Sequence, residues 1–439
     1  MGSFDDITLR GSSLKIILLI LISIVLLGTR EIKQNVLSYE ITPNFDASHG
    51  AGCVTNCDSV SISRENWIRS GRMVLSSFTV SLNSTAANTY TAFDATLPGS
   101  FTAAGSTPTG AMGVCYNSSA TAVTYASVIR LQTSTTFRWS AGAVSSSSQV
   151  YYCILAFRVA ESTPTDNVVE FPGISNGITD HTATTVTCNT GGGGNCNSAS
   201  MTNVNWSSWG GFTIGYAKVA IDVVAIDTVS AATFSLPFAH TMSGGLTNGL
   251  SGVCHPIIEV DNEYDQGFLT GSNSNANQVI FRNVRPYTDS TDIIYHCIFV
   301  NFDVGKNIET FETTQEKLPD GSCVSNCDNF NSVNTIWQKR GPHLFGILRA
   351  AANATSSSAS YTANFSIPGG YTLAGATNSS RGVCVGYRST PAPNGVVDPG
   401  WIESVDTTTL RFKAASISTS SGAAQYYCLF WATLTDSED

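Results

Sequence analysis

The sequence predicts an all-β fold of three tandem, disulfide-stapled antiparallel modules, each resembling a β-sandwich or jelly roll, behind an N-terminal hydrophobic segment. Three observations predict it. One spacing of Cys, Trp, Gly, Pro and Phe occurs three times along the 439 residues. The twelve cysteines divide evenly among the three copies. Charged residues make up 12% of the chain, about half the usual ~25%, and no amphipathic helix longer than two turns is evident.

The repeat is measured from the second cysteine of each copy, at Cys57, Cys196 and Cys327. A tryptophan follows at +10, a glycine at +14 and a proline at +41. A Gly-Val-Cys motif then supplies the third cysteine, and a phenylalanine stands 16 residues before the fourth. The positions concerned are Trp67, Trp206 and Trp337; Gly71, Gly210 and Gly341; Pro98, Pro237 and Pro368; and Phe137, Phe281 and Phe412.

The even partition of the cysteines indicates two disulfides per module, formed in an oxidising compartment. Within a module three pairings are open. Zinc is the weaker interpretation, because the first two cysteines are separated by four residues in modules 1 and 3 but by eight in module 2. The disulfide cysteines are Cys53, Cys57, Cys115, Cys153, Cys188, Cys196, Cys254, Cys297, Cys323, Cys327, Cys384 and Cys428.

An apolar run from Ile16 to Leu27 is interrupted only by Ser23. Its length suits a signal peptide better than a full membrane span of about 20 residues. Because Leu26-Leu27-Gly28 is a poor cleavage site, a retained signal anchor stays open. The predicted organisation is therefore a signal peptide or anchor (1–30), a spacer (31–47), module 1 (48–160), a linker (161–185), module 2 (186–303), a linker (304–320) and module 3 (321–439).

Strand patterns are clearest in module 1. The run from Tyr151 to Phe157 is continuously apolar and rich in β-formers, which predicts a central strand covered on both faces. The repeated prolines belong at a strand edge or a turn, because proline cannot donate to a β-ladder.

The repeated tryptophans are expected to lie in the cores, packed against a disulfide, because their spacing is fixed in three otherwise divergent copies. The unmatched ones, Trp139, Trp209, Trp401 and Trp431, are the better candidates for exposed contact residues.

A basic residue follows each repeated phenylalanine, at Arg138, Arg282 and Lys413. Since alternate residues of a strand point to opposite faces, each module is expected to present one cation at the same place on its surface. These three residues are the predicted contacts for a ligand or partner, such as an acidic glycan or a carboxylate of a neighbouring subunit. Pairing with a local acid is the alternative.

Two further clusters suggest metals only weakly. His255 and His296 flank cysteines of module 2 and could approach one another, but the other modules hold Tyr or Val there. Asp261, Glu263 and Asp265 alternate before a glycine without the spacing of an EF-hand. No metal or cofactor is therefore predicted.

Six Asn-x-Ser/Thr motifs are candidate N-glycosylation sites: Asn83, Asn117, Asn205, Asn353, Asn364 and Asn378. The net charge of −10, with no basic cluster, argues against nucleic acid as a partner. No His-Glu-x-x-His or free nucleophilic cysteine is present, and no module carries a distinctive acid, base and nucleophile, so an enzyme is not predicted.

These features favour a secreted or surface-anchored repeat glycoprotein with a structural or adhesive role, as a component of a coat or filament. Its expected partners are further copies of itself or neighbouring surface proteins, and the membrane is contacted only through an uncleaved N-terminal segment. The alternative is a multivalent carbohydrate-binding protein with one site per module. An extracellular hydrolase is the least favoured interpretation.

Overall fold

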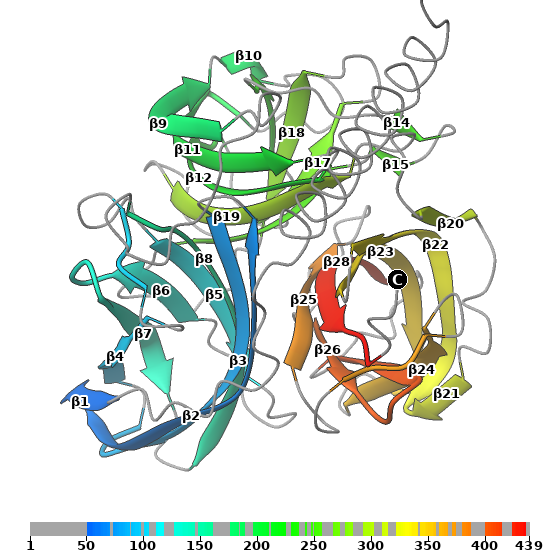
Figure 1. The fold of residues 1–439 in the computed structure, drawn as a ribbon, viewed down its shortest axis with the longest axis horizontal. Helices are drawn as coiled ribbons and strands as arrows, with labels where there is room; N and C mark the ends of the chain where they lie inside the picture. The colour runs from blue at the N-terminus through cyan, green and yellow to red at the C-terminus, as the bar shows by residue number, and fades with distance from the viewer. Residues whose placement is uncertain are drawn as a thin grey trace, which may run out of the picture. The chain divides into compact units, whose positions relative to one another are not determined.

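In the computed structural model, all the strands named below belong to residues 42–439. The structure describes residues 51–70, 73–87, 89–97, 101–104, 111–117, 127–144, 148–160, 176–183, 185–188, 196–209, 212–224, 230–236, 242–243, 247–248, 250–256, 267–272, 277–283, 293–302, 310–314, 322–340, 343–356, 360–367, 371–374, 380–387, 400–414 and 424–435. Every named element among them is a β-strand (Figure 1). The predicted all-β fold of tandem antiparallel modules is confirmed.

The strands fall into three large sheets, one for each repeat. The first contains β1 (Gly52–Thr55), β2 (Cys57–Ser70), β3 (Met73–Ser84), β4 (Thr89–Thr96), β5 (Ala111–Asn117), β6 (Ser127–Leu131), β7 (Thr136–Val144) and β8 (Gln149–Arg158).

The second sheet contains β9 (Asn176–Ala183), β10 (Thr185–Cys188), β11 (Ser198–Trp209), β12 (Phe212–Asp222), β13 (Ala231–Ser235), β16 (Leu250–Pro256), β17 (Gly267–Gly271), β18 (Gln278–Asn283) and β19 (Ile293–Phe302). A separate pair, β14 (Met242–Ser243) and β15 (Thr247–Asn248), stands beside it in the same module.

The third sheet contains β20 (Thr310–Thr314), β21 (Ser322–Ser325), β22 (Cys327–Arg340), β23 (His343–Ala354), β24 (Tyr361–Ser366), β25 (Ser380–Tyr387), β26 (Gly400–Ser404), β27 (Thr409–Ala414) and β28 (Ala424–Thr433).

All three sheets share one topology. The strand order in module 1 is β1-β4-β7-β6-β5-β8-β3-β2, and modules 2 and 3 repeat it strand for strand. Each also adds one strand at the end, β9 or β20, from a segment that the sequence suggested to be a linker. The 8-stranded and 9-stranded sheets are antiparallel throughout.

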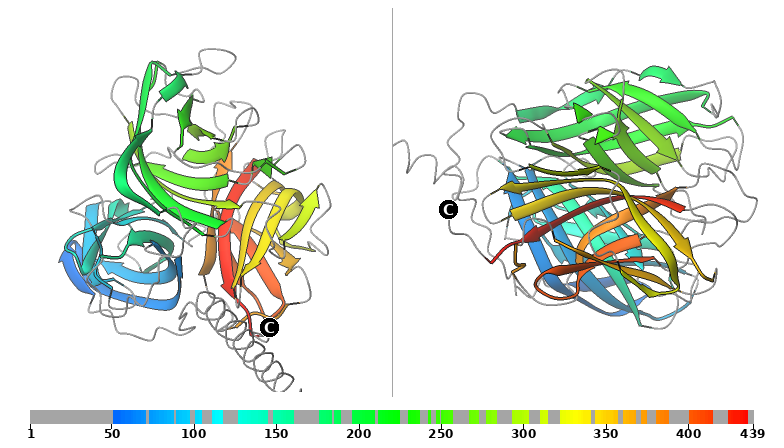
Figure 2. Two further views of the ribbon diagram at one scale, coloured as in Figure 1. Left: turned by 45° about the horizontal axis from the view of Figure 1, so that its top comes forward. Right: turned by 90° about the vertical axis from the view of Figure 1, so that its right-hand side faces the viewer.

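Each sheet curls until its two ends nearly meet, as the strongly bent strands of Figure 2 show. In module 1 the terminal strands β1 and β2 are joined by Asn56 alone, which has a φ of 46°. Its side chain accepts from the Ala86 amide at 2.7 Å and donates to the Ala86 carbonyl at 2.9 Å. Asn326 makes the equivalent turn in module 3 with Ser356, at a φ of 49°. Asparagine tolerates this left-handed conformation better than most residues, so it can close the corner.

Each curled sheet encloses one apolar core. The repeated phenylalanines are buried in these cores, at 1% exposure or less for Phe137, Phe281 and Phe412. The predicted central strand of module 1 is confirmed as β8, which lies between β5 and β3 with nearly all its side chains buried. Because Cys153 and Leu155 fill the core, Tyr152 and Ile154 point to the other face and are buried there too.

Six disulfides close the modules in one pattern. The first cysteine of each set pairs with the second, across separations of 4, 8 and 4 residues. The third pairs with the fourth across 38, 43 and 44 residues, joining residues that lie directly opposite on adjacent strands. The described residues include no free cysteine. Numerous disulfides are consistent with an oxidising compartment.

Candidate functional site

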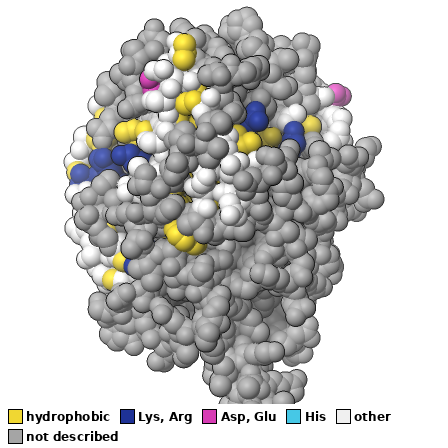
Figure 3. Space-filling view, turned by 90° about the horizontal axis from the view of Figure 1, so that it is seen from above, with side chains coloured by type: hydrophobic (Ala, Val, Ile, Leu, Met, Phe, Trp, Pro, Cys, Tyr) yellow, Lys and Arg dark blue, Asp and Glu magenta, His cyan; other side chains and the backbone are white. Residues whose placement is uncertain are grey.

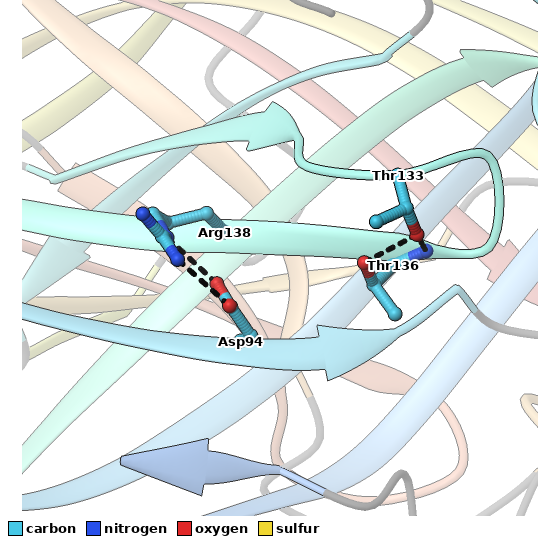
Figure 4. Close-up of polar contacts among 4 residues, drawn as sticks. All are labelled: Asp94, Thr133, Thr136 and Arg138. Carbon is cyan, nitrogen blue, oxygen red and sulfur yellow. Dashed lines mark hydrogen bonds and ion pairs between the residues drawn. The ribbon is translucent and has the colours of Figure 1, made fainter. Parts of the chain in front are cut away.

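Arg138 is the first of the three predicted contact cations, and it lies on β7 facing away from the core. Its Nε and Nη2 donate to the two carboxylate oxygens of Asp94 on β4, at 2.7 and 2.8 Å (Figure 4). This bidentate bond raises the pKa of Arg138. Thr133 and Thr136 share a 2.6 Å hydrogen bond in the turn before β7, which fixes the start of that strand.

Lys413 occupies the same position on β27 but has a different partner. Its ammonium lies 2.7 Å from a carboxylate oxygen of Glu403, whose side chain is only 1% exposed. The Arg411 guanidinium lies 3.7 Å from the same oxygen. Lys413 therefore neutralises a buried acid of its own module.

Arg282 on β18 lies between Ala231 and Phe268 on the neighbouring strands, and neither can neutralise it. Among the described residues it makes no ion pair within 4 Å. In Figure 3 the described basic side chains gather in separate places rather than in one field, and the visible acids are isolated. The three cations thus share a strand position but not an environment.

The strand position opposite each cation takes part in contacts between modules. Arg130, Phe268 and Trp401 stand opposite Arg138, Arg282 and Lys413, respectively. We call these three the receiving residues. The residues that precede each fourth cysteine, Tyr152, His296 and Tyr427, are called the pre-cysteine residues.

Two of the pre-cysteine residues stack on the receiving residue of another module, and the third lies near one. Tyr152 of module 1 stacks on Trp401 of module 3, with ring centroids 5.2 Å apart. Tyr427 of module 3 stacks on Phe268 of module 2 at 4.2 Å. Arg130 of module 1 is close enough to His296 of module 2 to lower its pKa. Together with the contact of Tyr116 with His255 described next, these contacts link module 1 to 3, 3 to 2 and 2 to 1, so they form a closed ring.

Further contacts reinforce this ring. The Tyr152 hydroxyl donates to Glu403 Oε2 of module 3 at 3.3 Å, and within module 3 Arg349 lies over the Tyr427 ring at 5.5 Å. Tyr116 of module 1 meets His255 of module 2 edge to face, with centroids 6.1 Å apart. The outer faces of the central strands are therefore buried between modules, which explains why the apolar runs show no alternation.

The two histidines of the ring lie directly opposite one another on β16 and β19, beside the Cys254–Cys297 disulfide. Burial lowers the pKa of each to about 3, and nearby His296 adds to the effect on His255. Lys218 and Arg130 lower the pKa of His296 further. No group of three metal-ligating residues occurs among the described residues. Because their pKa values are lowered to about 3, His255 and His296 are neutral at pH 7 where module 2 meets module 1.

The tryptophan hypothesis was correct in part. Trp337 is buried in the core of module 3, where its ring centroid lies 4.7 Å from that of Phe430. Trp206 is half-buried against the core of module 2. The exposed role given to Trp139, Trp401 and Trp431 is wrong, because all three are 2% exposed or less. Trp139 stacks on Phe93 inside its own core, while Trp401 is covered by Tyr152. The side chains of Trp67 and Trp209 are outside the described part.

The candidate glycosylation sites differ in exposure. Asn117 and Asn205 are 2% and 3% exposed. Their amides donate to Gln149 Oε1 at 2.8 Å and to the Asn203 carbonyl at 3.1 Å. Asn83, Asn353 and Asn364 are half-buried on strands. Asn364 accepts from Arg411 at 2.8 Å.

Several predictions fall outside the described residues. They concern Asn378, the repeated prolines, the acidic triplet of Asp261, Glu263 and Asp265, and the apolar run 16–27. Within the part that the structure does describe, no helix has the length and hydropathy of a membrane span.

Sequence reasoning singled out His296 and Trp401 for other roles but did not predict that pre-cysteine and receiving residues meet between modules. In the sequence the pre-cysteine residues are marked only by their place in the Tyr-x-Cys motif of each closing strand. The receiving residues vary from Arg to Phe to Trp and share no motif. No protein-family model, curated protein or solved structure matches the chain.

Proposed function

We propose that the protein is a non-catalytic structural or adhesive surface protein whose three modules act as one pseudotrimeric subunit of a coat or filament. The observation that supports it is the closed ring of contacts between modules, made by Tyr152 with Trp401, Tyr427 with Phe268 and Tyr116 with His255. In such a ring each module meets its two neighbours through two different surfaces, one for each neighbour, as subunits of a cyclic homotrimer do.

This arrangement suits repeated lateral contacts. Because the sheet faces within the ring are buried, the modules are held together as one body rather than linked as a flexible chain. Any feature of the outer surface is then presented three times at fixed spacing. A subunit with three near-equivalent contact points can join its neighbours into a planar coat, and the expected partners are copies of itself or neighbouring surface proteins.

The compartment supports the same proposal. Six disulfides persist in secreted proteins and on the extracellular face of membranes. We place the modules there, tethered if residues 14–28 are retained and free if they are cleaved. Asn83 and Asn353 are the favoured glycan acceptors, because Asn117 and Asn205 are buried and hydrogen-bonded.

The test is electron microscopy of the full chain purified from a secreting eukaryotic host, combined with a glycan array. Ordered sheets or filaments that form as the concentration rises, with no signal on the array, would support the structural role. Single particles at every concentration, with saturable binding to a defined glycan, would overturn it.

A carbohydrate-binding protein is the second candidate, and Arg282 is the observation that favours it. Arg138 and Lys413 are already engaged by Asp94 and Glu403, so Arg282 is the cation best placed to meet an acidic sugar. Binding to an acidic glycan that is lost in Arg282→Ala, but kept in Arg138→Ala, would support this role.

A further inference from the structure

Three buried polar atoms lack a hydrogen-bond partner, within the described part of the chain, where module 1 contacts module 2. They are the hydroxyl of Tyr116 and the Nδ1 atoms of His255 and His296. Tyr116 meets His255 edge to face, and His255 lies directly opposite His296 on the adjacent strand. All three side chains are at least nine-tenths buried. We call them the histidine cluster. Because buried polar groups are normally hydrogen-bonded, this cluster favours a bound ligand.

The charges that act on the histidine cluster are positive. Lys218 on β12 lies directly opposite His296 and continues the row of the two histidines. After burial itself, Lys218 and Arg130 are what lowers the pKa of His296, and no acid among the described residues raises it. The pKa of His255 is lowered by burial and by His296. Hydrogen-bond donors in a positive potential suit an anion rather than a metal ion.

The contact between modules 1 and 3 shows which kind of partner such a place takes. There the Tyr152 hydroxyl donates to Glu403, and the Lys413 ammonium lies 2.7 Å from the same carboxylate. Glu403 stands two residues after the receiving residue of module 3. Two residues after its own receiving residue, module 1 has Gln132, a neutral amide. The contact between modules 2 and 1 therefore keeps basic groups but has no acid at this position.

We propose that the histidine cluster binds one chloride ion, which takes the part that the Glu403 carboxylate plays between modules 1 and 3. The Tyr116 hydroxyl and one N–H of each imidazole donate to the ion, since a neutral imidazole keeps one donor nitrogen. The nearby Lys218 ammonium balances its charge. A monovalent ion is favoured over divalent sulfate or phosphate, because the cost of taking an ion out of water rises steeply with its charge.

Chloride binding is expected to depend on pH. A bound anion favours the protonated form of the two imidazoles, because opposite charges attract. The other titratable groups that face the imidazoles are Tyr116 and Arg130 from module 1 and Lys218 from β12, and none of them gains a negative charge in acid. The affinity for chloride should therefore be higher at pH 5 than at pH 7.5.

Urea unfolding of the full chain tests the site in solution. Chloride is exchanged for gluconate, an anion too large for a buried site, at constant ionic strength. Chloride at ten times its dissociation constant should lower the equilibrium constant of unfolding about elevenfold. The matched control is His255→Val with His296→Tyr, which copies Val385 and Tyr427 of module 3 and should show no such effect. The same response to chloride in both proteins, or none in the wild type, would overturn the proposal.

Bromide locates the ion in the wild-type chain and so covers the case in which the control variant misfolds. Crystals soaked in sodium bromide should show one anomalous peak within hydrogen-bond distance of the Tyr116 hydroxyl and an imidazole nitrogen. Lys218→Gln, at a half-buried position, should weaken this peak. Density without an anomalous signal would identify an ordered water instead, and zinc bound by the imidazoles would identify a metal site. Bromide in crystals without a chloride effect in solution would be an adventitious ion only. Each of these three outcomes contradicts a chloride site.

Discussion

Tyr152 of module 1 lies face to face with Trp401 of module 3, with ring centroids 5.2 Å apart and planes inclined by 16°. Its hydroxyl reaches Glu403, which is also bound by Lys413. One residue thus joins an aromatic contact to a buried ion pair of another module. Tyr427, at the same strand position of module 3, makes the equivalent stack on Phe268 of module 2.

Two substitutions of Tyr152 separate the contribution of its hydroxyl from that of its aromatic ring. Tyr152→Phe removes the hydrogen bond of the hydroxyl to Glu403 and should lower the free energy of unfolding by about 1 kcal/mol. Tyr152→Ala also empties a buried space and should cost about 3–5 kcal/mol. Urea unfolding of the full chain measures both. A double-mutant cycle with Trp401→Ala should show a coupling above about 0.5 kcal/mol, and additive effects would argue against the contact.

The two kinds of disulfide should differ in their effect on stability. Cys115→Ala with Cys153→Ala opens a loop closed across 38 residues and should cost about 4 kcal/mol. Cys53→Ala with Cys57→Ala opens a separation of only 4 residues and should cost about 2 kcal/mol. Thermal unfolding of the two double variants, side by side, checks the order. A greater loss from the shorter loop would contradict the entropic explanation.

In modules 2 and 3 a phenylalanine ring occupies the space left by a glycine on the adjacent strand. Gly346 faces Phe430, and a Cβ on this glycine would overlap the ring. Gly215 faces Phe299 in the same way, whereas module 1 has Ser76 opposite Leu155. Module 1 therefore has a larger residue in place of the glycine, Ser76, and a smaller one in place of the phenylalanine, Leu155.

This exchange of volume predicts a rescue. Gly346→Ala should destabilise the protein by about 1–3 kcal/mol, because the added methyl group overlaps the ring of Phe430. Adding Phe430→Leu should restore part of the loss, since it reproduces the smaller partner found in module 1. Chemical unfolding of both single variants and the double variant measures the coupling. If the double variant loses as much free energy of unfolding as the two single variants together, Gly346 and Phe430 do not share this space.

The sequence predicted the fold well but not how the modules meet. A fixed spacing in three copies is set by packing inside each module, so it identified the core positions of Phe137 and Trp337. Contacts between modules leave no fixed residue type in the repeat, because the receiving residue changes from Arg130 to Phe268 to Trp401. Trp401 is therefore a contact residue, but the contact is within the chain. Likewise, β9 and β20 carry no repeated spacing that distinguishes them from linkers, and pairing to an edge strand is what orders them.

The histidine pair should make the protein sensitive to acid. His255 and His296 have a pKa of about 3 in the folded chain, well below the unfolded value of about 6.5. The groups that face them are Tyr116, Lys218, Arg130 and each other, none of which can neutralise a new positive charge. Since the unfolded chain binds more protons below pH 6.5, the stability is fully present above that pH. It is lost progressively as the pH falls toward 3, by roughly 2 kcal/mol for each histidine at pH 5.

Module 1 supplies the variant that tests this effect. Replacing both histidines with tyrosine, as in Tyr116 and Tyr152, removes the two titrating groups while keeping aromatic rings at the interface. Urea midpoints between pH 7.5 and 4.5 should fall steeply in the wild-type chain and much less in the double variant. His343→Gln, at a position outside the ring, should follow the wild type. If the urea midpoints of all three proteins fall in parallel, acid destabilises the protein at other groups, because the double variant differs from the wild type only at His255 and His296.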